Sequence, residues 1–187
     1  MRRLRRPRAP IKSILMTADT IGGVWTYSIE LARALSASGI TVYLATMGEA
    51  PSEAQRKEAK AAGNIKLFES SFKLEWMEDP WADVEKSGEW LLLLEAELCP
   101  DIVHLNGYCH GASAFKAPVL ITAHSCVLSW WAAVKGGTAP PSWERYREEV
   151  ARGLWSADMI VAPTNAMLSA IYGNYFVRAS CRVIHNG

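Results

Sequence analysis

The sequence predicts an α/β fold, a Rossmann-like and doubly wound, mostly parallel sheet with helices on both faces. Two observations lead to this prediction. Short apolar runs alternate with helix-like segments along almost the whole chain. These runs are apolar throughout, as expected of strands buried on both faces, and do not alternate with polar residues. Strands separated by helices join in parallel through right-handed crossovers, which place helices on both sides of the sheet.

The first half of the chain supplies three of the expected strands. Their apolar runs span residues 11–16, 40–47 and 65–68. Apolar residues recur at helical spacing between the first two runs, at Val24, Tyr27, Leu31 and Leu35. Gly39 is expected to end that helix in a left-handed conformation. Ser52 and Gln55 form a capping-box pattern, which predicts a second helix that stops at Gly63.

The second half supplies four more strands and three helices. The strands are expected at 101–105, 118–123, 158–162 and 181–185. The helices are expected at 81–98, from Trp143 to Leu154, and at 164–172. Two segments, 69–80 and 127–141, show no periodicity, and we expect irregular structure in both.

Composition favours a single domain in a reducing compartment. The chain has 187 residues, of which 50% are hydrophobic, and this is enough for one sizeable core. No secretory signal and no apolar run of the ~20 residues needed to span a bilayer is seen. The four cysteines show no CxxC spacing, so we expect reduced, buried thiols in a cytoplasmic protein.

Positive charge is concentrated at the amino terminus. The net charge is only +1, yet six basic residues fall within the first twelve. We expect residues 1–10 to form a disordered basic arm and residues 11–187 to form the domain. The arm is either an ordinary solvated terminus or a contact to an anionic surface. Of the anionic partners, we favour the inner face of a membrane, contacted peripherally, and expect no nucleic acid.

Polar residues and glycines follow the carboxyl ends of five predicted strands. They are Asp19, Gly22 and Gly23; Asn106 and Tyr108; His124 and Ser125; Thr164 and Asn165; and Asn186. In a parallel sheet these ends share one edge, where ligands bind. Two adjacent glycines that open a helix let phosphate or sugar oxygens approach backbone N–H groups, although a simple tight turn would use them equally well. The GxGxxG dinucleotide fingerprint is absent, which disfavours a nicotinamide cofactor.

Histidines and cysteines allow less specific readings. His124 could be a loop histidine bonded to backbone, and His104, inside a strand, is expected to be a core histidine. Cys109 and His110 lack a second pair of ligands at useful spacing, so we expect no metal site. Cys126 lies near His124, but the sequence shows neither a nucleophile elbow nor a helix start there, which disfavours a thiol hydrolase.

Five segments together resemble glycosyltransferase family 4. In order they are DTIGGVWTYSIELARAL, PDIVHLNGY, PVLITAHS, ADMIVAPTNAM and VIHNG. Members of this family have the GT-B fold, in which two Rossmann-like domains face each other across a cleft. The starch and glycogen synthase branch is less similar, because it carries a lysine just before the glycines, where this chain has Thr20 and Ile21.

The resemblance implies roles for the rim residues. It implies transfer of a sugar from a nucleotide-sugar donor with retention of configuration, usually without a metal. Gly22 and Gly23 would lie near the donor diphosphate, and His124 would hydrogen-bond the transferred sugar or stabilise the transition state. Backbone N–H groups and a donating side chain would suit a leaving diphosphate. Asp19 would orient an acceptor hydroxyl, or merely cap the helix. Further substrate-binding candidates, taken from their positions on the rim, are Asn106, Tyr108 and Asn165.

The family's second domain, which grips the nucleotide, would follow VIHNG, where this sequence ends. We therefore expect the amino-terminal, acceptor-side half of the enzyme, inactive by itself and dependent on a donor-binding domain or a companion chain. The acceptor would be a sugar or a lipid-linked sugar, selected by residues 69–80 and 127–141. The alternatives are a non-catalytic α/β module that binds a sugar, a lipid headgroup or a partner domain, and a different nucleotide-binding domain.

Overall fold

The structure of the protein is a computed structural model that describes residues 10–186. The predicted basic arm therefore lies outside the described residues, apart from Pro10. Within the described part, no helix combines the length and apolar character that crossing a membrane requires.

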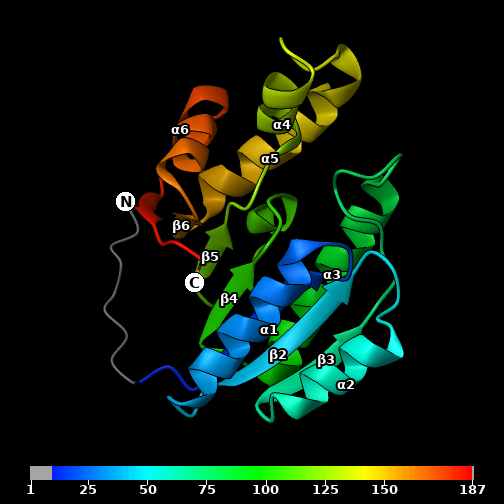
Figure 1. Ribbon diagram of the computed structural model, residues 1–187, viewed down its shortest axis with the longest axis vertical. Helices are drawn as coiled ribbons and strands as arrows, with labels where there is room; N and C mark the ends of the chain where they lie inside the picture. Colours follow the sequence, from blue (N-terminus) through cyan, green and yellow to red (C-terminus); the bar gives the residue numbers. More distant parts are fainter. Residues whose placement is uncertain (1–9, 187) are drawn as a thin grey trace.

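In the described part of the chain, seven parallel strands form a single sheet in the order β3-β2-β1-β4-β5-β6-β7 (Figure 1). The strands are β1 (Ser13–Asp19), β2 (Thr41–Met47), β3 (Ile65–Glu69), β4 (Ile102–Leu105), β5 (Val119–Thr122), β6 (Met159–Ala162) and β7 (Ser180–Val183). Each of the seven predicted strands is present, and the predicted Rossmann-like fold class is confirmed. The order runs outward from β1 in both directions, so the chain changes direction between β1 and β4.

Within residues 10–186, six α-helices and two short 3₁₀ helices connect the strands. The α-helices are α1 (Gly23–Ser36), α2 (Glu53–Ala61), α3 (Trp81–Leu98), α4 (Val127–Val134), α5 (Glu144–Ser156) and α6 (Asn165–Asn174), and the 3₁₀ helices are η1 (Cys109–Ala112) and η2 (Pro141–Trp143). In Figure 1, α1 crosses the near side of the sheet and α3 lies behind it.

Alternate residues of β1 enter two separate hydrophobic clusters. Ile14 and Met16 pack with Trp25 and Ile29 of α1, whereas Leu15 belongs to the larger cluster that includes Leu91 of α3. All six side chains are at most 7% exposed. This two-sided burial explains why three successive residues of the strand, Ile14 to Met16, are all apolar.

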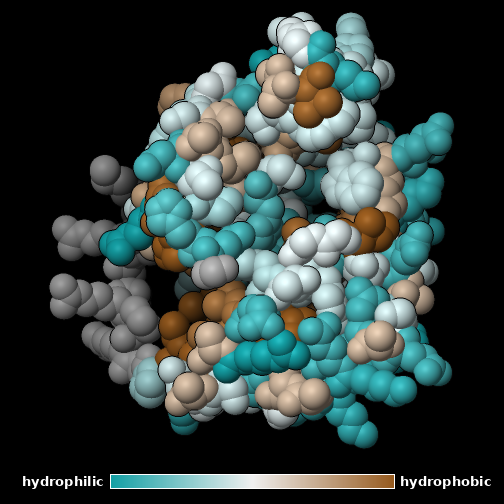
Figure 2. All heavy atoms as spheres, in the orientation of Figure 1, coloured by the Kyte–Doolittle hydropathy of each residue, from teal (hydrophilic) through white to brown (hydrophobic). Residues whose placement is uncertain are grey.

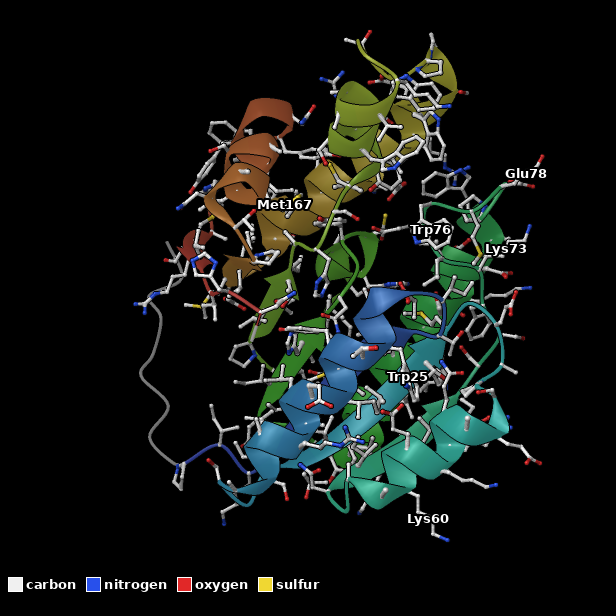
Figure 3. The ribbon with its side chains drawn as sticks, viewed as in Figure 1. Trp25, Lys60, Lys73, Trp76, Glu78 and Met167 are labelled. Atoms are coloured by element: carbon white, nitrogen blue, oxygen red, sulfur yellow. The ribbon has the colours of Figure 1, made fainter. Side chains whose placement is uncertain are left out.

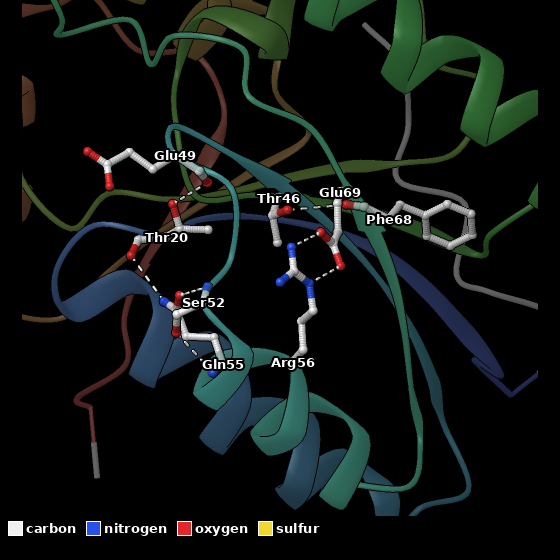
Figure 4. A network of polar contacts seen from close by, with 8 residues as sticks. All are labelled: Thr20, Thr46, Glu49, Ser52, Gln55, Arg56, Phe68 and Glu69. Atoms are coloured by element: carbon white, nitrogen blue, oxygen red, sulfur yellow. Dashed lines mark hydrogen bonds and ion pairs between the residues drawn. The ribbon is translucent and has the colours of Figure 1, made fainter.

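The capping box that the sequence predicts is present and holds the loop after β1 in place. The Ser52 side chain accepts a hydrogen bond from the Gln55 N–H, and the Gln55 side chain accepts one from the Ser52 N–H. Gln55 Nε2 also donates to the Thr20 carbonyl at 3.1 Å, and Thr20 Oγ1 donates to the Glu49 carbonyl at 2.7 Å (Figure 4). The loop that leads to Gly22 is thereby held by Glu49, just after β2, and by Gln55 of α2.

Residues 127–141 are more regular than predicted, because Val127–Val134 form α4. Its helix cap is unusual, since the Cys126 sulfur accepts from the Ser129 N–H where an oxygen normally does so. None of its eight residues is fully buried. The sequence therefore showed neither an ordinary cap nor a buried stripe. Cys126 therefore stands at a helix start, contrary to the prediction that no helix begins there. Cys109 and Cys126 are buried as expected, whereas Cys99 is exposed and Cys181 is half-buried, which corrects the expectation that all four thiols are buried.

Candidate functional site

A cavity of about 440 Å³ lies at the carboxyl ends of β1, β4 and β5. Figure 2 shows the surface hollowed between α1 and the part of the molecule formed by α4 and α5, whereas the surface over α2 is mainly hydrophilic. The cavity has two parts with different chemistry. The polar floor consists of Asp19, Asn106 and His124. The aromatic wall consists of Trp76, Trp130, Trp131, Trp143 and Tyr146.

The structure brings most of the predicted site residues to this cavity. Asp19, Asn106, Tyr108 and His124 all line it, although they come from three separate segments of the chain. Their strands are neighbours in the sheet, since Met16 of β1 pairs with His104 of β4, and His104 pairs with Leu120 of β5. The parallel register thus brings the polar groups to one edge.

Gly22 and Gly23 open α1 beside the cavity, and both are exposed. Gly22 has φ +90°, a conformation that strains any residue with a side chain. Gly23 has no such conformation, and a Cβ placed there would meet no atom of the described residues within 4 Å. The backbone conformation therefore explains the glycine at position 22, whereas neither conformation nor packing among the described residues requires one at position 23.

Asn165 is placed differently from the other candidates. It is the first residue of α6, it is exposed, and it is not among the residues that line the cavity. The α6 cap is the Thr164 side chain, which accepts from the Met167 N–H at 3.0 Å. Position at a strand end was therefore not enough to bring Asn165 to the site.

Among residues 10–186, the His124 ring has a side-chain hydrogen-bond partner and no backbone partner. Its Nε2 lies 2.9 Å from Asn106 Oδ1, and the Tyr27 ring packs edge-on against the imidazole at 4.5 Å between centroids. Burial lowers the pKa of His124 to about 4, because the charged form loses hydration. The imidazole is consequently neutral at pH 7.

Asn106 joins the polar floor to the first strand and the first helix. Its Nδ2 donates to the Thr17 carbonyl at 2.6 Å and to Ser28 Oγ at 3.2 Å. Its backbone N–H donates to Thr17 Oγ1 at 2.9 Å. These contacts span 78 to 89 residues of sequence, so no local pattern could have revealed them.

Asp19 is a carboxylate with an unused oxygen. Oδ1 is buried and has no hydrogen-bond partner among the described residues. Burial raises the pKa of Asp19 to about 6, and a hydrogen bond from the Ile21 backbone opposes that rise. Among the described side chains, none caps α1. Asp19 therefore does not show the capping role that was its alternative, and its free oxygen can accept a proton or a hydrogen bond inside the cavity.

Glu75 is a cavity residue that sequence reasoning missed. It is 8% exposed, and its carboxylate accepts from the Tyr108 N–H at 3.0 and 3.1 Å and from the Cys109 N–H at 2.8 Å. Burial raises the pKa of Glu75, while these N–H groups lower it. Glu75 thus anchors the loop whose next residue, Trp76, projects toward the cavity (Figure 3). The only signal in the sequence was an acidic residue between Leu74 and Trp76.

The remaining histidines in strand and helix positions are satisfied by structural contacts. His104 Nε2 lies 2.7 Å from Thr122 Oγ1, and burial lowers the pKa of His104 to about 3, so it is the core histidine that was expected. His110 Nε2 lies 2.8 Å from Ser87 Oγ and 3.2 Å from the Val84 carbonyl. Both imidazoles therefore have structural contacts in the core, and His124 is the histidine that lines the cavity.

Residues 21–187 match the family described as Glycosyltransferase Family 4. The chain belongs to glycosyltransferase family 4. This match confirms the resemblance to glycosyltransferase family 4 that the five sequence segments indicated. A comparison with curated proteins finds no match.

Solved structures share the fold of this family 4 domain. A glycosyltransferase from Rickettsia africae is 19% identical with a TM-score of 0.67, over 96% of this chain and 44% of that chain. The sucrose-phosphate synthase of Thermosynechococcus elongatus is 15% identical with a TM-score of 0.71, over 94% and 48%. Phytolacca americana UGT2, complexed with UDP-2fluoro-glucose and pterostilbene, is 11% identical with a TM-score of 0.61, over 95% and 54%. This chain therefore spans about half the length of the structures that it matches, as one Rossmann-like half of a GT-B fold.

Proposed function

We propose that this family 4 domain is the acceptor-binding half of a glycosyltransferase that transfers a sugar from a nucleotide-sugar donor with retention of configuration. The observation that carries the proposal is the cavity, because it combines a polar floor at the strand ends with an aromatic wall. Aromatic faces bind sugar rings and other amphipathic acceptors, and the floor can orient a reacting hydroxyl. Phytolacca americana UGT2, which shares this fold, is complexed with both UDP-2fluoro-glucose and pterostilbene, and this is consistent with a donor and a separate acceptor.

The residues of the site would share the work as follows. Asp19 Oδ1 would accept a hydrogen bond from an acceptor hydroxyl, and Tyr108 and Asn106 would shape the floor. The N–H groups at the start of α1, next to Gly22 and Gly23, would face the donor diphosphate as its negative charge develops. The open space at Gly23 supports this, since no contact with a described residue requires a glycine there. The proposal assigns the diphosphate to these N–H groups and to the donor-binding domain, without a resident metal.

The isolated chain is expected to have no measurable transfer activity, because the structures that it matches are about twice its length. We would incubate the purified 187-residue chain with UDP-, ADP- and GDP-sugars and measure release of the nucleoside diphosphate. Adding the donor-binding domain, as a continuous or companion chain, should restore release. Robust turnover by the chain alone would contradict the proposal. Tight binding of a free dinucleotide would favour the different nucleotide-binding domain instead.

His124→Ala in the complete two-domain transferase tests the polar floor directly. We expect kcat to fall by about 100-fold, in the range found when one well-placed polar group of an active site is removed. The unfolding free energy of the variant should change little, because His124 lies at the half-buried edge of the core. Asn165→Ala is the matched control, since it removes a polar residue from the same rim but outside the cavity. Unchanged kcat in His124→Ala would remove His124 from the mechanism and leave a non-catalytic binding module as the better description.

A further inference from the structure

The amide of Asn106 can adopt only one orientation. Its Nδ2 lies 2.6 Å from the Thr17 backbone carbonyl, which accepts hydrogen bonds and cannot donate them. The reversed amide would put two carbonyl oxygens against each other at that distance. Nδ2 therefore faces Thr17, and Oδ1 faces His124.

The orientation of Asn106 determines which imidazole nitrogen carries the proton. Oδ1 is an acceptor, so His124 Nε2, at 2.9 Å, must donate. Because burial lowers the pKa of His124 to about 4, the ring carries only one proton at pH 7. Nδ1 is then unprotonated, and among the hydrogen bonds of the described residues none involves it.

We propose that Asn106 is a positioning residue that fixes His124 in its Nε2–H tautomer, so that His124 offers the substrate a hydrogen-bond acceptor at Nδ1. This differs from the donating histidine that the resemblance led us to expect. A neutral imidazole with a free Nδ1 lone pair accepts from a hydroxyl and does not donate to a phosphate.

The rest of the cavity lining has the same character. The second polar group of the floor, Asp19 Oδ1, is also an unpartnered acceptor. The charged residues that line the cavity are Asp19 and Glu75, and no described lysine or arginine lines it. The floor is therefore suited to hydroxyl groups of a neutral sugar or polyol and disfavours an anionic group in the same place. This statement about the substrate rests on the proposed function, whereas the tautomer is a property of the chain itself.

The tautomer can be measured in the 187-residue chain without any substrate. Proton–nitrogen correlation spectra of the ¹⁵N-labelled chain at pH 7 would be recorded, with His124 assigned through a His124→Gln variant. We expect a protonated Nε2 and an unprotonated Nδ1 in the wild type. In Asn106→Leu, which keeps the side-chain size but removes the acceptor, the Nε2 proton signal of His124 should be lost to exchange with water.

His110 is the internal control, because its Nε2 faces the Val84 carbonyl and should keep its proton signal in both proteins. A wild-type His124 protonated at Nδ1, or a His124 Nε2 signal that persists in Asn106→Leu, would overturn the proposal. If Asn106→Leu does not fold, the His110 signal will be lost as well. The wild-type spectrum then tests the proposal by itself, because it shows which nitrogen of His124 carries the proton.

A kinetic measurement separates this inference from the proposed function. In the complete transferase, Asn106→Leu should lower kcat by at least about tenfold with the acceptor KM within about twofold, because an imidazole in the wrong tautomer binds nearly as well but reacts poorly. Equal changes in kcat and KM would instead indicate general damage to the pocket and would contradict the positioning role. Absence of transfer by the wild type would refute the proposed function and leave the spectroscopic result intact.

Discussion

The polar floor and the aromatic wall of the cavity are built by different means. The floor residues lie at the ends of β1, β4 and β5, and Asn106 joins them through hydrogen bonds to Thr17 and Ser28. The wall residues lie on a loop, on α4, on η2 and on the first turns of α5. Trp130 is 48% exposed and Trp76 is 43% exposed, and none of the residues of α4 is fully buried.

This difference suggests a division of tasks. Hydrogen bonds that link sheet positions far apart in sequence leave the floor one arrangement, as a reaction centre requires. Aromatic contacts hold the wall, such as Trp130 against Trp131 at 6.2 Å between centroids and Trp143 against Tyr146 at 5.6 Å. Such contacts can shift with less loss than a buried hydrogen bond. We therefore expect substitutions in the floor to change stability or kcat and substitutions in the wall to change acceptor KM.

Glu75→Ala should have the largest effect on stability, since Glu75 ties the loop that carries Trp76 to the backbone of Tyr108 and Cys109. The variant leaves the buried N–H groups of Tyr108 and Cys109 without their acceptor, and we expect a loss of about 2–4 kcal/mol in unfolding free energy. Urea denaturation of the 187-residue chain would measure it. Glu75→Gln is the matched control, because an amide oxygen in the place of Oε2 still accepts from both N–H groups. Equal losses in the two variants would show that the hydrogen bonds do not anchor the loop.

Asp19→Asn should stabilise the chain while it impairs the site. The folded-state pKa of about 6 lies above the ordinary 3.8, so the stability associated with Asp19 is fully present below pH 4 and is lost as the pH rises through 6. The amide carries no charge, so at pH 7 the variant should be more stable by about 1–2 kcal/mol, a value reduced for the partial exposure of Asp19.

The measurement for Asp19 is the difference in unfolding free energy between wild type and variant, taken from pH 4 to pH 7. The difference cancels the contribution of the buried histidines, which is the same in both proteins. Because burial lowers their pKa values, these histidines reduce the unfolding free energy as the solution is acidified, which is opposite to the effect of Asp19. A difference that does not grow between pH 4 and pH 6 would contradict the burial of the charge.

Trp130→Ala should have a smaller effect, confined to acceptor binding. We expect the acceptor KM of the complete transferase to rise about 5–10-fold, with kcat within about twofold, through loss of one aromatic contact. Trp155→Ala is a close control, because Trp155 is 44% exposed and contacts Phe176 and Arg178 outside the cavity. Equal KM values in the two variants would mean that the aromatic wall does not contact the acceptor.

Much of the fold could be predicted because its signals are local. Continuous apolar runs marked all seven strands, the predicted bounds of α3 are those observed, and the Ser52–Gln55 pattern correctly marked the start of α2. Parallel strands also imply a shared edge, so Asp19, Asn106, Tyr108 and His124 could be proposed as neighbours from their order alone. The same rule included Asn165, whose strand end lies farther from β1 in the sheet.

Local patterns could not reveal the contacts that make the site specific. The α4 helix was missed because a cysteine sulfur caps it and no buried stripe marks it. Glu75 was missed because its partners lie 33 and 34 residues away. The positions of the helices and strands along the chain follow from local conformational preferences and from patterns of apolar residues, both of which the sequence shows directly. The orientation of the Asn106 amide, and with it the proton on His124, depends on a carbonyl 89 residues away, which the folded sheet alone brings within reach.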